Sequence, residues 1–95
     1  MNIQHEQKDK RGHFFVRDGE TLAAEMTYVQ HDPETIIIDH TEVSAALQGK
    51  NVGYALVEAA AEYARTNNLK IIPACSFAAA VFQKKQELRD VLKEE

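Results

Sequence analysis

The spacing of apolar residues changes near the middle of this 95-residue chain, and this change constrains the fold more than any other feature. Between residues 20 and 30, apolar side chains occupy every second position, which is typical of a strand with one buried face. From residue 52 to residue 64 they recur at i, i+3 and i+4 with charged residues between them, which is typical of an amphipathic helix. The chain therefore predicts strands followed by at least one helix.

The first half predicts antiparallel strands joined by tight turns. Asp18-Gly19 is a strong hairpin signal between two apolar runs, and residues 31–34 form a second turn. Residues 35–38 are β-branched throughout, which predicts a central strand covered on both faces. The expected strands are residues 2–7, 11–17, 20–30 and 35–38, the first of them at an edge of the sheet.

The second half predicts a crossover unit and a final helix. Asn67 and Asn68 end the amphipathic helix, because asparagine tolerates the left-handed conformation that closes a helix. Ser76 is positioned to cap the last helix. The expected elements are a helix from residue 52, a short strand at 70–73, a helix at 76–85 and one further turn at 87–92. A strand, a helix and a strand in succession form a parallel β-α-β crossover. We therefore expect an α/β fold of the α+β kind, with an antiparallel meander of about four strands, a helix, a short parallel strand and a C-terminal helix.

Length and charge narrow the functional classes. Ninety-five residues predict one domain, residues 1–95. The formal net charge is −4, and the one basic stretch, residues 8–11, is interrupted by an aspartate, so no nucleic-acid partner is expected. No run approaches the roughly 18 apolar residues of a membrane span, and the first residues lack an apolar leader. Cys75 is the only cysteine, so no intramolecular disulfide forms and a cytoplasmic location is expected.

Residues 48–55 carry the strongest chemical signal. Small and flexible residues follow a predicted strand and open a predicted helix, whose first N–H groups lack partners and carry partial positive charge. Gly53 lets a ligand approach the backbone, and Lys50 adds a formal charge, so the segment is a candidate anion site. It is neither a Walker A loop nor a three-glycine dinucleotide fingerprint. On spacing alone, an ordinary glycine-containing turn remains the alternative.

The same segment resembles the acetyl-CoA signature of the GNAT acetyltransferase superfamily, Arg/Gln-x-x-Gly-x-Gly/Ala. Gln48 matches its first position and Gly53 its last, whereas Asn51 stands where glycine is usual; asparagine accepts unusual backbone angles better than most residues. Two further segments, residues 39–43 (Asp-His-Thr-Glu-Val) and 73–77 (Pro-Ala-Cys-Ser-Phe), resemble a short GNAT-like subfamily of about this length. The resemblance covers nearly the whole chain.

This resemblance implies acetyl-CoA as the cofactor. In GNAT folds the pantetheine arm pairs with the strand before the signature, and the pyrophosphate meets the helix start. The N–H of Val43 is the candidate oxyanion donor beside the thioester. The implied cofactor-binding residues are Thr41, Glu42 and Val43 on the strand, and Gln48, Gly49, Lys50, Asn51, Val52, Gly53, Tyr54 and Ala55 at the helix start.

Three residues are candidates for catalysis. Cys75, expected near a helix start, is either an acetyl acceptor facing the thioester or a small buried hydrophobic residue. His40 is either a general base, toward an amine or toward Cys75, or a structural histidine. Glu42 is the second candidate base, or else a charged strand residue. The other histidines show no metal-ligand spacing with one another or with Cys75, so no metal is expected.

The chain also departs from larger GNAT enzymes. It has only a turn where those enzymes place one or two helices between the first two strands, and its last helix lacks the tyrosine that often protonates departing CoA. The leading function is acetyl transfer to an unidentified small amine or protein amine. The alternatives are a non-catalytic module that binds or senses acyl-CoA, and an interaction domain with a vestigial groove. Oligomeric state has no signature in the sequence.

Overall fold

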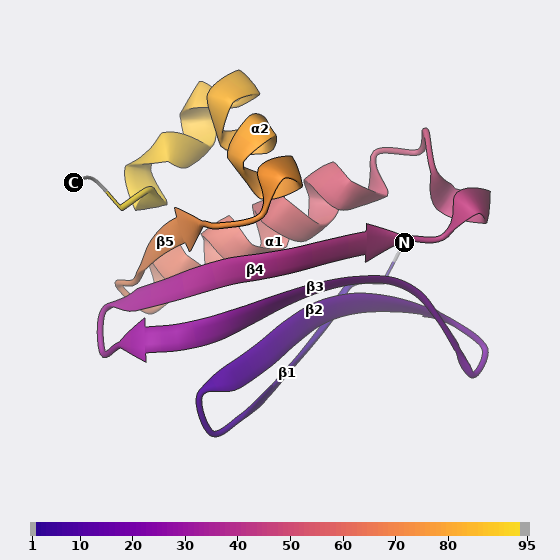
Figure 1. Cartoon of the computed structure of the whole chain (residues 1–95), viewed down its shortest axis with the longest axis horizontal. Helices are drawn as coiled ribbons and strands as arrows, with labels where there is room; N and C mark the ends of the chain where they lie inside the picture. Colours follow the sequence, from indigo (N-terminus) through magenta and orange to yellow (C-terminus); the bar gives the residue numbers. More distant parts are fainter. Residues whose placement is uncertain (1, 94–95) are drawn as a thin grey trace.

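The computed structural model describes residues 2–93, and its centre is one five-stranded sheet in the order β1-β2-β3-β4-β5. The elements are β1 (Gln4–Lys8), β2 (Arg11–Asp18), β3 (Thr21–Asp32), β4 (Thr35–Val43), η1 (Ala45–Leu47), α1 (Val52–Thr66), β5 (Lys70–Pro73), α2 (Ser76–Lys84) and η2 (Gln86–Val91). The first four strands pair antiparallel, and β4 pairs with β5 in parallel. Figure 1 shows this meander followed by the two helices beside β4 and β5. The predicted architecture is confirmed.

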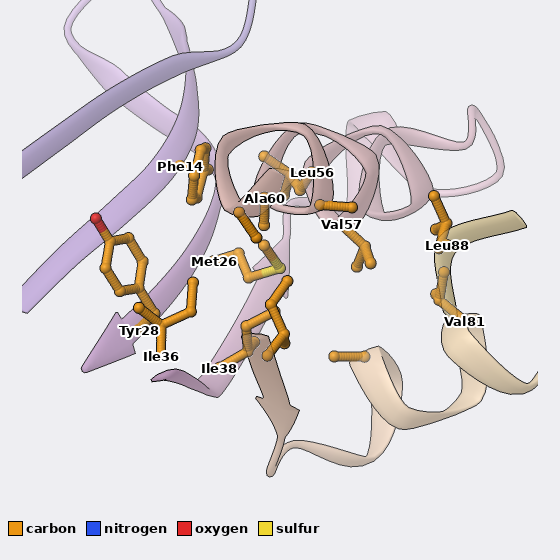
Figure 2. Close-up of a cluster of buried hydrophobic side chains, with 14 of the residues drawn as sticks. Phe14, Met26, Tyr28, Ile36, Ile38, Leu56, Val57, Ala60, Val81 and Leu88 are labelled. Atoms are coloured by element: carbon orange, nitrogen blue, oxygen red, sulfur yellow. The ribbon is translucent and has the colours of Figure 1, made fainter. Parts of the chain in front are cut away.

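One face of the sheet and both helices share a single hydrophobic core. Phe14 and Met26, and likewise Tyr28 and Ile38, occupy paired positions of the sheet and belong to one buried cluster with residues of α1 such as Leu56 (Figure 2). Val81 of α2 and Leu88 of η2 close the same cluster. Because the helices bury only one face, polar side chains occupy much of the other, which we call the open face. Among residues 2–93, no helix is long and apolar enough to cross a membrane.

Three details of the predicted elements were wrong. Ile37 is only half-buried, because the core lies on the other face of β4 and leaves this one partly exposed. Leu22 is exposed, since the register shifts between Val16 and Arg17 of β2 and leaves Ala23 as an extra residue in β3. Ser76 does not cap α2; the N-cap is Cys75, whose sulfur accepts a hydrogen bond from the helix backbone.

His5 joins the edge strand β1 to the core. Its ring stacks on Phe14 at 4.1 Å between centroids, and its Nε2 lies 2.7 Å from the Tyr28 hydroxyl. Burial, with a smaller contribution from the charge of His13, lowers the pKa of His5. Folding therefore favours the neutral form of His5.

Gly12 is expected to be the least replaceable glycine for stability. It pairs with Tyr28 across β2 and β3, and a Cβ built on Gly12 would overlap the ring of this fully buried tyrosine. Because the ring is held by its neighbours, we expect Gly12→Ala to lower the free energy of unfolding by about 2–3 kcal/mol in urea denaturation. Gly19→Ala, in open space at φ 65°, is the control for backbone strain alone and should cost about 1 kcal/mol. Equal losses in the two variants would contradict the steric argument.

Candidate active site

The site begins where β4 and β5 part. The two strands pair only from Thr35 to Ile38 on β4, and beyond that point β4 continues to Val43 while the other strand ends at Pro73. Two successive backbone N–H groups, those of Ala74 and Cys75, donate to the carbonyl of Ile38 at 2.9 and 3.1 Å. These bonds fix the point of divergence and leave a wedge between the end of β4 and the start of α2.

The edge of β4 that faces the wedge carries backbone N–H and carbonyl groups that are not paired with another strand. Ser44 donates its N–H to Ala23 of β3, so the N–H and carbonyl of the preceding residue, Val43, point away from β3. The side-chain amide of Gln48 donates to this Val43 carbonyl at 3.3 Å, which agrees with that direction. An extended ligand in the wedge would therefore meet an unpaired strand edge.

The loop between η1 and α1 forms the second part of the site. Gly49 has φ 82° and Asn51, the N-cap of α1, has φ 62°, so asparagine here adopts the left-handed conformation expected of it. The Asn51 side chain makes no capping hydrogen bond, and the first turn of α1 contains no acidic residue. The N–H groups of this turn therefore remain available to an anion.

A cavity of about 360 Å³ joins the strand edge to the helix start. Its lining residues are Thr41, Val43, Leu47, Gln48, Gly49, Asn51, Val52, Gly53, Tyr54 and Phe77. Eight of the eleven residues expected to bind cofactor therefore lie together. Lys50 instead borders a neighbouring hollow on the β2 side of the loop, and the Ala55 N–H is already bonded to the Asn51 carbonyl. Glu42 is the third residue outside the cavity, and it pairs with Glu25 of β3.

Phe77 also lines this cavity, although the sequence did not predict a binding role for it. Its ring lies against Gly53, where a Cβ would overlap it, and the side chain is 38% exposed. The absence of a side chain at Gly53 therefore allows the ring of Phe77 to pack closely against the helix start. The only feature of the sequence that could have indicated this role is that an aromatic residue follows Cys75 by two positions.

Cys75 lies half-buried at the start of α2. Its Sγ accepts a hydrogen bond from the Ala78 N–H at 3.4 Å and lies 3.4 Å from the Thr41 hydroxyl oxygen. The start of α2 places partial positive charge beside the sulfur, and the Thr41 hydroxyl lies within hydrogen-bond distance of it. Thr41, expected to act only through its backbone, is therefore the side chain that meets Cys75.

His40 and Glu42 lie on the other side of the sheet from Cys75. They pair in register with Thr27 and Glu25 on the open face, whereas Thr41 pairs with Met26 of the core. His40 Nε2 is 3.6 Å from Glu42 Oε1, and both side chains are well exposed. The structure does not bring His40 to Cys75, so the hypothesis that His40 serves as base toward that thiol loses its geometric basis.

A bulge in β4 is the physical reason for this placement. Tyr28 pairs with Ile38 but Thr27 pairs with His40, so Asp39 is an extra residue in β4. An extra residue reverses which face each later side chain occupies. Without it, His40 would follow Ile38 onto the core face.

Comparisons with known proteins agree with this architecture. Residues 13–91 match a family model described as GCN5-related N-acetyl-transferase. The NMR solution structure of a GCN5-like N-acetyltransferase candidate from Staphylococcus aureus is 40% identical in sequence, covers 99% of this chain and 91% of its own, and superposes with a TM-score of 0.75. None of the curated proteins compared with the chain matches it.

Proposed function

We propose that this chain binds acetyl-CoA and transfers the acetyl group to an amine. The proposal starts from the family: the chain belongs to the GCN5-related N-acetyltransferases. The observation that carries the proposal is the single cavity in which an unpaired strand edge meets an uncapped helix start. A linear ligand with amides at one end and phosphates at the other fits that order of backbone groups.

In this proposal each part of the cofactor has its own protein groups. The pyrophosphate accepts hydrogen bonds from the first turn of α1, where the helix dipole favours an anion. The pantetheine arm lies along the β4 edge at Thr41 and Val43, and one of its amides replaces Gln48 at the Val43 carbonyl. The Val43 N–H, which points into the wedge, is the donor for the oxyanion of the thioester.

We propose that the acetyl group passes through Cys75. The thiolate attacks the thioester carbonyl, a new carbon–sulfur bond forms at Cys75, and CoA leaves as a thiolate. The Ala78 N–H and the Thr41 hydroxyl stabilise the attacking sulfur. An amine then takes the acetyl group and returns the thiolate. In this route the amine loses its proton to solvent, because His40 and Glu42 lie on the open face, on the other side of the sheet from Cys75.

Binding of acyl-CoA without turnover is the second candidate function. The observation that favours it is the composition of α2: Phe77 and Phe82 occupy the helix, and no tyrosine lies within Ser76–Lys84 to protonate departing CoA. The covalent route lessens the need for a proton donor to CoA, because the Cys75 thiolate replaces the CoA thiolate.

Isothermal titration tests the shared premise of both functions. We expect CoA and acetyl-CoA to bind with dissociation constants on the order of micromolar, about 8 kcal/mol. Intact-mass measurement after incubation with acetyl-CoA then separates the two functions, since only the covalent route adds one acetyl group that hydroxylamine removes. Absence of binding at millimolar CoA would refute both.

A further inference from the structure

Two lysines gather around an aromatic residue that lines the cofactor cavity. Tyr54, in the first turn of α1, receives a hydrogen bond from Lys84 Nζ to its hydroxyl at 3.5 Å. Lys85 Nζ lies over the same ring, 5.6 Å from its centroid. Both ammonium groups therefore lie beside a residue that lines the cavity.

Two aromatic rings, one from α1 and one from α2, form this side of the cavity. Tyr54 meets Phe77 edge to face, with centroids 6.1 Å apart. Phe77 and Lys84 are seven residues apart on α2, so they lie on nearly the same side of the helix, about 10 Å apart along its axis. This side of α2 therefore runs from Phe77 at the cavity to positive charge at Lys84 and Lys85.

This concentration of charge is local. The whole chain has a formal net charge of −4, yet Lys50 stands at one end of the cavity loop and the lysine pair stands beyond Tyr54. A helix C-terminus alone accounts for one lysine in its last turn, because cations there oppose the helix dipole. It does not account for both lysines lying against Tyr54, which belongs to another helix and lines the ligand cavity.

We propose that Lys84 and Lys85 bind the 3′-phosphate on the ribose of CoA, so that the protein distinguishes CoA from 3′-dephospho-CoA. This proposal rests on the proposed function, since it takes the pyrophosphate at the start of α1 as its starting point. The ribose and its phosphate lie beyond the pyrophosphate, on the side away from the thioester. A phosphate monoester carries roughly two negative charges at neutral pH, which matches two ammonium groups.

Titration of the full chain with CoA and with 3′-dephospho-CoA tests the proposal. Because exposed ion pairs are individually weak, we expect the wild type to prefer CoA by roughly five- to thirtyfold at low salt. Lys84→Gln with Lys85→Gln should remove this preference by weakening CoA alone, with the affinity for 3′-dephospho-CoA unchanged. Lys50→Ala is the control for loss of a lysine on the other side of the loop: it borders a neighbouring hollow, so its loss should change the affinity for both ligands by the same factor.

The possible outcomes separate this proposal from the one on which it depends. Equal affinity of the wild type for the two ligands overturns the phosphate site and leaves cofactor binding intact. A preference that survives in the double glutamine variant, folded by circular dichroism, overturns the assignment to these lysines. If the wild type binds neither ligand, the proposed function fails and this proposal fails with it.

Discussion

Glutamate at position 53 is expected to abolish CoA binding, with a loss of at least about a hundredfold, or about 2.8 kcal/mol. Gly53 is buried in the first turn of α1, and any side chain there meets the ring of Phe77. The glutamate would therefore displace Phe77 from the cavity wall and place a negative charge among N–H groups proposed to bind pyrophosphate. Isothermal titration with CoA measures the loss.

Two matched variants divide that loss into its steric and electrostatic parts. Gly53→Gln introduces a side chain of the same length without the charge, so it should bind CoA more weakly than the wild type but more tightly than the glutamate variant. Phe77→Ala leaves Gly53 unchanged and removes only the ring. A Gly53→Glu protein that keeps wild-type affinity, with an unchanged melting temperature, would mean that the phosphate does not bind at this helix start.

Serine at position 75 is expected to eliminate the acetyl adduct while cofactor binding remains. A hydroxyl is far less acidic than a thiol, so it does not supply the nucleophile at neutral pH. It still accepts the Ala78 N–H at the start of α2, and serine is a preferred N-cap, so the helix should be retained. Intact-mass spectrometry with acetyl-CoA measures the adduct, and titration measures the binding.

The alanine variant separates the cap from the chemistry. Cys75→Ala removes both the nucleophile and the cap, so it should lose the adduct like serine and also unfold more readily, by about 0.5–2 kcal/mol. If the serine variant acetylates amines as fast as the wild type, the thiol is structural and transfer to the amine is direct. If the wild type forms no adduct and acetylates no amine in a broad panel, non-catalytic acyl-CoA binding replaces the proposed enzyme.

These two experiments test different links of the same proposal. Gly53 lies in the part of the cavity proposed to bind phosphate, and Cys75 lies where β4 and β5 diverge. Loss of binding in the first with loss of only the adduct in the second would establish that cofactor binding and acetyl transfer depend on separate residues.

The sequence by itself determined the order and type of the elements. Alternation in β3, the i, i+3, i+4 spacing in α1 and the Asp18-Gly19 turn each depend on neighbours within a few residues, so local patterns were sufficient. The loop was also predictable, because a left-handed backbone at Asn51 is a property of that residue and its helix start. These local features also carried the family resemblance.

Only the tertiary structure decided which side chains meet at the site. The bulge at Asp39 turns Thr41 toward Cys75 and His40 toward the open face, and strict alternation along β4 would have reversed the two. The contacts of Gly53 with Phe77 and of Tyr54 with the two lysines likewise join segments more than twenty residues apart. Such contacts depend on strand register and helix packing, and a one-residue change in register moves every later side chain to the other face. The pattern of residues along one strand does not indicate where the register will change by one residue.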